Sequence, residues 1–89
     1  MIKKYIIING NPILFSIKMM HSEMVSKTLK VDSAGFCFLI KNKRSGELKV
    51  ICMGESTSLS VRSRPEIDQK IVSRFLKHDV SERNKPKEI

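Results

Sequence analysis

The chain has 89 residues and a formal net charge of +8, with a hydrophobic fraction of 40% and a charged fraction of 29%. This length allows one small domain with a modest core, and the composition is that of a globular protein rather than a disordered one. The first apolar patch is interrupted at Asn9-Gly10-Asn11-Pro12, and no apolar run reaches the length of a membrane span. We therefore expect neither a signal peptide nor a membrane span. We expect a cytoplasmic location and, with it, reduced cysteines.

The first strand is predicted at the apolar run Tyr5 to Ile8, which ends at Asn9-Gly10. Asn-Gly is among the strongest two-residue hairpin signals because both residues tolerate positive φ. We therefore expect an antiparallel hairpin in which Ile13 to Ile17 pairs with the first run. Because Pro12 lacks an N–H, this second strand should lie at an edge of the sheet.

Residues 17–28 admit two interpretations. Apolar side chains recur there at three- and four-residue spacing, which predicts an amphipathic helix, while continuation of the preceding strand through Met20 is the competitor. The methionines Met19, Met20 and Met24 would fill core gaps or, alternatively, present an adaptable surface to a partner. The stretch from Leu29 to Gly35 is expected to be a connection.

A second hairpin is predicted as the central pair of the sheet. The apolar runs Phe36 to Ile40 and Leu48 to Met53 flank a turn at Lys43 to Gly46, where Gly46 suits a left-handed position. A four-residue loop places Cys37 directly opposite Cys52, whereas a three-residue loop offsets them.

The last two elements are a strand and a helix. A turn at Glu55-Ser56 precedes the alternating stretch Thr57 to Arg64, which predicts a half-buried strand with a polar outer face. Pro65 then begins a helix over about 65–78, since proline suits the first turn and acidic residues follow it. Its apolar stripe comprises Ile67, Ile71, Val72, Phe75 and Leu76. Residues 79–89 are expected to form a disordered charged tail.

No catalytic constellation is recognisable in the sequence. His21 is the formal candidate base for a cysteine nucleophile, and the acidic residues are scattered. Zinc sites use three or four protein ligands, and the two histidines show no ligand spacing, so neither a metal nor a cofactor is predicted. The cysteines are expected to pack as small buried hydrophobes, with redox or metal chemistry as the alternative if both are exposed together.

The segment Gly35-Phe36-Cys37-Phe38-Leu39 resembles the core of the aromatic octapeptide of the RNA-recognition motif. The resemblance implies a strand that presents two rings for base stacking. The resemblance covers five to ten residues. The sequence departs from the signature at Ala34 and Lys41, and a hairpin strand follows at the point where the family has a helix. The sequence therefore assigns no family.

We predict an α+β fold with a small antiparallel sheet of about four to five strands, a C-terminal helix on one face and a second short helix at about 17–28. Residues 1–78 form the domain. The positive charge favours a non-catalytic binding module that contacts nucleic-acid phosphates. The predicted site residues are Ser58, Ser60, Arg62, Arg64, Lys18, Lys27 and Lys30.

The alternative hypothesis is a protein-interaction or homo-oligomeric accessory module with no nucleic-acid role. A homodimer could form by edge-strand pairing of residues 12–17 or 57–62. Clustering of Arg62, Arg64 and the lysines on one face would favour the first hypothesis, and an exposed patch of methionine and isoleucine would favour the second.

Overall fold

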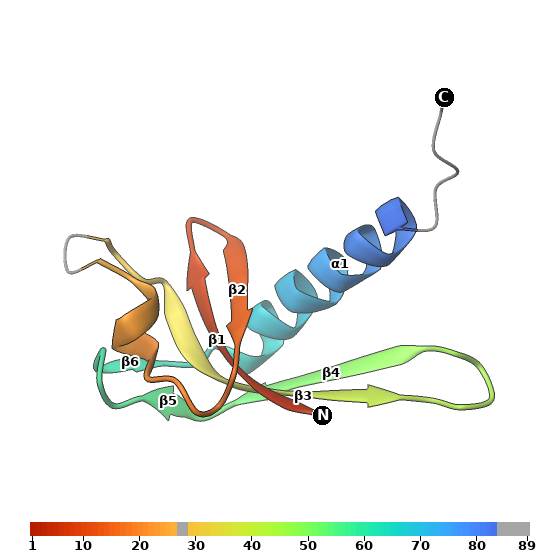
Figure 1. The fold of residues 1–89 in the computed structure, drawn as a ribbon, viewed down its shortest axis with the longest axis horizontal. Helices are drawn as coiled ribbons and strands as arrows, with labels where there is room; N and C mark the ends of the chain where they lie inside the picture. Colours follow the sequence, from red (N-terminus) through yellow and green to blue (C-terminus); the bar gives the residue numbers. More distant parts are fainter. Residues whose placement is uncertain (27–28, 84–89) are drawn as a thin grey trace.

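The computed structural model describes residues 1–26 and 29–83. They form a four-stranded antiparallel sheet of order β2-β1-β3-β4, a separate two-stranded sheet of β5 and β6, and one C-terminal helix (Figure 1). The predicted small α+β fold is confirmed. The elements are β1 (Ile2–Ile8), β2 (Asn11–Phe15), the 3-10 helix η1 (His21–Met24), β3 (Ser33–Lys41), β4 (Leu48–Met53), β5 (Glu55–Ser56), β6 (Val61–Arg62) and α1 (Pro65–Arg83).

The first hairpin is turned by Asn9 and Gly10, whose φ angles of 53° and 76° are both positive, as predicted. Its second strand begins earlier than expected, at Asn11 instead of Ile13, and ends at Phe15. Strand β2 lies at an edge of the sheet, which confirms the position expected from Pro12.

The second hairpin has the register expected for a four-residue loop, because Cys37 lies directly opposite Cys52. The prediction that β3 and β4 form the centre of the sheet is wrong, since β1 and β3 are the central strands and β4 is an edge. The reason lies in β1, where Tyr5, Ile6 and Ile7 are all fully buried. A strand that buries both faces needs neighbours on both sides and cover above and below.

The sheet buries its two faces under different elements. Helix α1 covers one face, where Val72 packs on the sheet residues Tyr5, Ile7, Cys37, Val50 and Cys52. On the opposite face, Ile6, Phe15 and Ala34 form a second cluster. They pack against Met24 at the end of η1, against Val25 after it, and against Leu59 and Val61 from the β5–β6 hairpin. This second cover extends over only part of its face, as Figure 1 shows by the long bare end of the β3–β4 hairpin.

The helix expected over residues 17–28 is not formed over 17–26. Only His21–Met24 is helical, as a single 3-10 turn, and β2 does not continue to Met20 either. Local side-chain bonds favour this compact turn, because the carboxylate of Glu23 accepts the N–H of Met20 at 2.9 Å. The buried ring of His21 then fixes the turn against the sheet. Residues 27–28 lie outside the described part of the chain.

The strand predicted from Thr57 to Arg64 is confirmed only at Val61–Arg62 and is wrong for the other residues of that range. Residues 57–60 form the turn of the β5–β6 hairpin, in which Ser60 has a positive φ of 55°. Ser56, which was expected in a turn, lies in β5. Its hydroxyl accepts a hydrogen bond from the N–H of Leu59 at 3.2 Å. Serine favours such turns because its hydroxyl satisfies nearby backbone groups. The reversal brings Leu59 and Val61 together in the second cluster.

Helix α1 begins at Pro65 as predicted and continues to Arg83 rather than ending at residue 78. Five residues of the expected tail are therefore helical, and residues 84–89 lie outside the described chain. The predicted apolar stripe is only partly buried: Val72 is fully covered, whereas Ile67 and Phe75 are 52% and 44% exposed. Within the described residues, no helix is both long and apolar enough to cross a membrane.

Candidate functional site

The predicted line of serine and arginine side chains does not form a phosphate-binding strand face. Ser58 and Ser60 lie in the β5–β6 turn, and only Arg62 is in a strand. Both arginines lie near carboxylates: Arg62 is 3.9 Å from Glu55 at the surface, and Arg64 is 3.2 Å from the buried Asp68.

The predicted lysines do not complete that face. Lys18 lies in the turn after β2, and Lys30 lies in the connection that precedes β3, both exposed to solvent. Lys27 lies outside the described residues. Among the lysines predicted for the site and described by the structure, neither lies on the strand that carries Arg62.

A buried carboxylate joins the sheet to the helix. Asp68 is fully buried, and it accepts hydrogen bonds from the hydroxyls of Tyr5 (2.6 Å) and Ser33 (2.7 Å) and from the backbone N–H of Arg64 (2.8 Å). Burial, followed by the adjacent Asp68, raises the pKa of Tyr5 far above its ordinary value of 10. A tyrosine that holds its proton this firmly serves as a structural donor rather than as a base.

The two cysteines are buried free thiols, packed between sheet and helix. Burial raises the pKa of Cys37 to about 11 and that of Cys52 to about 12. Because the thiolate is the nucleophile and the metal ligand, these side chains fit the expected structural role better than redox or metal chemistry. No cluster of three or more metal-ligating side chains occurs among the described residues.

His21 does not approach the cysteines as a catalytic base would. Its ring lies on the opposite face of the sheet, edge-on to Phe15 and Phe36 at centroid distances of 5.3 and 5.9 Å. Its Nε2 is 2.9 Å from the carbonyl oxygen of Gly35, and burial lowers its pKa below the ordinary value of 6.5. The ring is therefore a neutral packing group.

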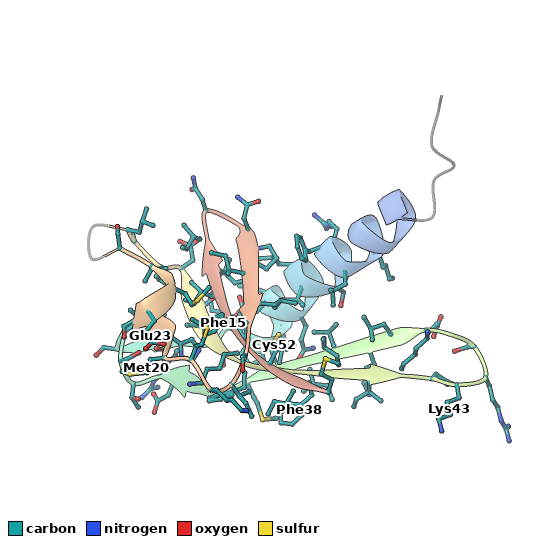
Figure 2. The ribbon with its side chains drawn as sticks, in the orientation of Figure 1. Phe15, Met20, Glu23, Phe38, Lys43 and Cys52 are labelled. Atoms are coloured by element: carbon teal, nitrogen blue, oxygen red, sulfur yellow. The ribbon has the colours of Figure 1, made fainter. Side chains whose placement is uncertain are left out.

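The first surface that stands out is the bare half of the sheet opposite α1, which we call the open face. Figure 2 shows Phe38 on this side of the sheet, away from the helix. Ile2, Phe38 and Ile51 lie directly opposite one another on three neighbouring strands, so they form one apolar row. The open face comprises Ile2, Phe36, Phe38, Ile40, Ile51 and Met53, of which Ile2, Ile40 and Met53 are exposed and the others half-buried.

The second surface is the space between the edge strand β4 and the helix, which we call the β4–α1 groove. It has a volume of about 950 Å³ and is lined by Leu48, Lys49, Val50, Glu66, Gln69, Lys70, Ser73, Arg74 and Lys77. Figure 1 shows the helix starting beside β4 and diverging from it along its length. Four cations and one carboxylate line the groove, so its charge is positive.

Sequence reasoning missed the cations of this groove as a group. Lys70, Arg74 and Lys77 follow one another at spacings of four and three residues, which places them along one side of a helix. That signal was present in the sequence. What it did not contain was the position of this helix side beside a free sheet edge, which depends on the strand order.

No family model, curated protein or solved structure matches the chain. The resemblance of residues 35–39 to the RNA-recognition motif does not extend to the fold, since β3 is followed directly by β4 and the described helices are η1 and α1. Its two rings do point to the open face, but Phe36 packs against His21.

Proposed function

We propose that the protein is a non-catalytic interaction module that pairs with a second copy of itself through the open face. The observation that carries this proposal is the continuous apolar row across β1, β3 and β4 in the uncovered half of the sheet. An exposed patch that includes isoleucine and methionine is the feature that favours an interaction module over a phosphate-binding one.

The charge of the open face favours a protein partner. The six residues of the open face include no carboxylate. Of the cations beside them, Lys4 already donates to the carbonyl oxygen of Met19 at 2.7 Å, and Lys49 lies opposite Ile40 toward the hairpin end. A surface with an apolar centre and few charges is typical of homodimer interfaces, whereas binding of a polyanion relies on free cations.

A second copy is the occupant that this geometry accommodates most simply. An antiparallel sheet face packs on another sheet face at a separation of about 10 Å, with the side chains interdigitated. A two-fold interface requires only one self-complementary patch on each chain. Of residues 57–62, which were expected to pair at an edge, only Val61–Arg62 form a strand. Packing through the open face needs no free edge.

Sedimentation equilibrium tests this proposal with Phe38→Glu. The wild-type chain should dimerise at concentrations of about 100 µM or below, and burying the new carboxylate should weaken dimerisation at least about tenfold. Ile67→Glu is the matched control, because Ile67 is 52% exposed on α1, outside the open face. A monomeric wild-type chain, or equal losses in the two variants with unchanged circular dichroism, would reject the proposal.

Nucleic-acid binding through Ser58, Ser60, Arg62, Arg64, Lys18, Lys27 and Lys30 stays a prediction. Labelled single- and double-stranded oligonucleotides can be titrated at about 50 and 200 mM salt, where phosphate contacts should show a steep loss of affinity. Weaker binding by the Arg62→Ala/Arg64→Ala variant would place the contact at these arginines.

A further inference from the structure

We infer that the β4–α1 groove binds an extended acidic peptide segment, which adds to the sheet as a fifth strand beside β4. This goes beyond self-association, because the groove lies at the sheet edge and the open face lies on the side of the sheet opposite the helix. The inference rests on the direction of the β4 backbone groups, the charge of the groove and the position of β4 as an edge strand of the sheet that residues 1–26 and 29–83 form.

The backbone of β4 presents hydrogen-bonding groups to the groove. In an antiparallel pair, alternate residues direct their N–H and C=O toward the neighbouring strand and away from it. Asn42 donates to the carbonyl of Glu47 at 2.8 Å, so Lys49 and Ile51 also face β3. Leu48, Val50 and Cys52 therefore face outward.

Gln69 on α1 confirms this direction, and it satisfies one of the outward backbone groups of β4. The side-chain oxygen of Gln69 accepts the outward N–H of Cys52 at 3.0 Å. Within the described residues, no hydrogen bond engages the outward N–H groups of Leu48 and Val50. An incoming strand would find two adjacent docking residues with the ladder spacing that a β-strand requires.

The cations on α1 select the chemistry of that strand. Lys70, Arg74 and Lys77 are exposed along the helix side of the groove, and no ion pair within 4.0 Å joins them to a carboxylate of residues 1–26 or 29–77. The side chains of Leu48 and Val50 point toward the helix, so every second side chain of an added strand does the same. Glutamate or aspartate at these alternate positions would meet the cations.

The same charges argue against the competing occupants. A second copy paired through β4 would bring two sets of groove cations together, which is unfavourable. A nucleic acid could supply acceptors for the free N–H groups but lacks donors at strand spacing for the outward carbonyl groups. A carboxylate-bearing strand satisfies the N–H groups, the carbonyl groups and the cations at once.

The test is fluorescence anisotropy with a labelled, end-capped peptide in which glutamate alternates with valine. Lys70→Glu/Arg74→Glu should weaken its binding at least about tenfold, since two attractive contacts become repulsive. The matched control is Lys43→Glu/Arg44→Glu, which makes the same change in net charge at the β3–β4 hairpin loop and should change affinity by less than about twofold. Equal weakening by the two variants would overturn the inference, because it would show attraction to net charge alone.

Backbone pairing is tested without altering the protein. Two further peptides carry N-methyl groups on one or the other alternate set of residues, and only one set should abolish binding, because an added strand uses half of its N–H groups. Binding should also slow amide hydrogen exchange at Leu48 and Val50. Equal affinity of both methylated peptides would overturn strand addition. An oligonucleotide that outcompetes the peptide and depends on Lys70 and Arg74 would overturn the peptide as the occupant.

Sedimentation and peptide binding report separately on the two proposals. Phe38→Glu should weaken dimerisation at least about tenfold and leave peptide affinity within about twofold of wild type, because Phe38 lies outside the groove lining. The Lys70→Glu/Arg74→Glu variant should retain the dimer.

Discussion

At the level of single residues, His21 shows how one side chain can replace a longer element. Its ring fills the space between Phe15 and Phe36, and only 4% of the residue is exposed. The hydrogen bond to the Gly35 carbonyl occupies one ring nitrogen. The connection between β2 and β3 is therefore attached to the sheet by a neutral imidazole, in place of the helix expected from the apolar spacing.

Stability should depend on pH through this ring. Because burial lowers the pKa of folded His21 below its ordinary 6.5, the unfolded chain takes up a proton first as the pH falls. Its contribution is complete above about pH 6.5 and decreases as the pH falls toward the lower folded pKa. Urea unfolding at about pH 7.5 and 5.5 should show a larger loss of stability for wild type than for His21→Gln. His78 is present in both proteins, so equal losses would contradict the assignment to His21.

At the level of elements, the β5–β6 hairpin shows why alternation misled the prediction. Serine at every second position from Ser56 to Ser60 fits the polar face of a strand, but it fits a turn equally well. The pattern contains no glycine to mark the reversal, because Ser60 itself adopts the positive φ.

Replacing Ser60 with glycine should therefore stabilise the protein. A non-glycine residue in the left-handed region costs about 1 kcal/mol, so Ser60→Gly should raise the free energy of unfolding by about 0.5–1 kcal/mol. Urea denaturation measures this change. Ser58→Gly is the control and should destabilise, because the Ser58 hydroxyl accepts the N–H of Ser22 at 3.2 Å. A destabilised Ser60→Gly variant would show that the left-handed backbone is not the limiting feature of this turn.

At the level of the whole molecule, Asp68 holds three segments together. It binds Tyr5 from β1, Ser33 from β3 and the backbone at the start of α1, and these residues are 63, 35 and 4 positions away in the sequence. The carboxylate, read from the sequence as a helix-dipole residue, is also the polar centre of the interface between sheet and helix.

Asp68→Asn should reduce the free energy of unfolding by about 3 kcal/mol, because the amide N–H₂ would face donors that the carboxylate oxygens now accept and because the ion pair with Arg64 would be lost. Thermal or urea denaturation measures the loss. Glu66→Gln, an exposed change in the same helical turn, should cost less than about 0.5 kcal/mol. Similar costs for the two variants would mean that Asp68 acts through the helix dipole alone.

The turn-defined parts of the fold could be predicted because their determinants are local. Asn9-Gly10 fixes the first hairpin, and the loop at 43–46 fixes the register that places Cys37 opposite Cys52. Pro65 and the acidic residues after it mark the helix start. Each signal acts within a few residues of the chain, so it can be read without knowing which segments pack beside it.

The candidate site was less predictable than the fold. The phosphate-binding face was predicted on a single strand, but that stretch forms most of the β5–β6 hairpin instead. The open face and the groove exist because β1 pairs with β3 and leaves β4 at the edge. The aromatic residues and cations involved could be read from the chain, but which of them remain uncovered could not.

By itself, then, the sequence determined the α+β class, both tight hairpins, the Cys37–Cys52 register and the start of the C-terminal helix, since turn chemistry and periodicity are local properties. Only the tertiary structure decided the strand order, the single turn at His21–Met24, the reversal at residues 57–60 and the two open surfaces. Those features depend on competition between distant segments for the two faces of one sheet, and short-range preferences do not encode the outcome of that competition.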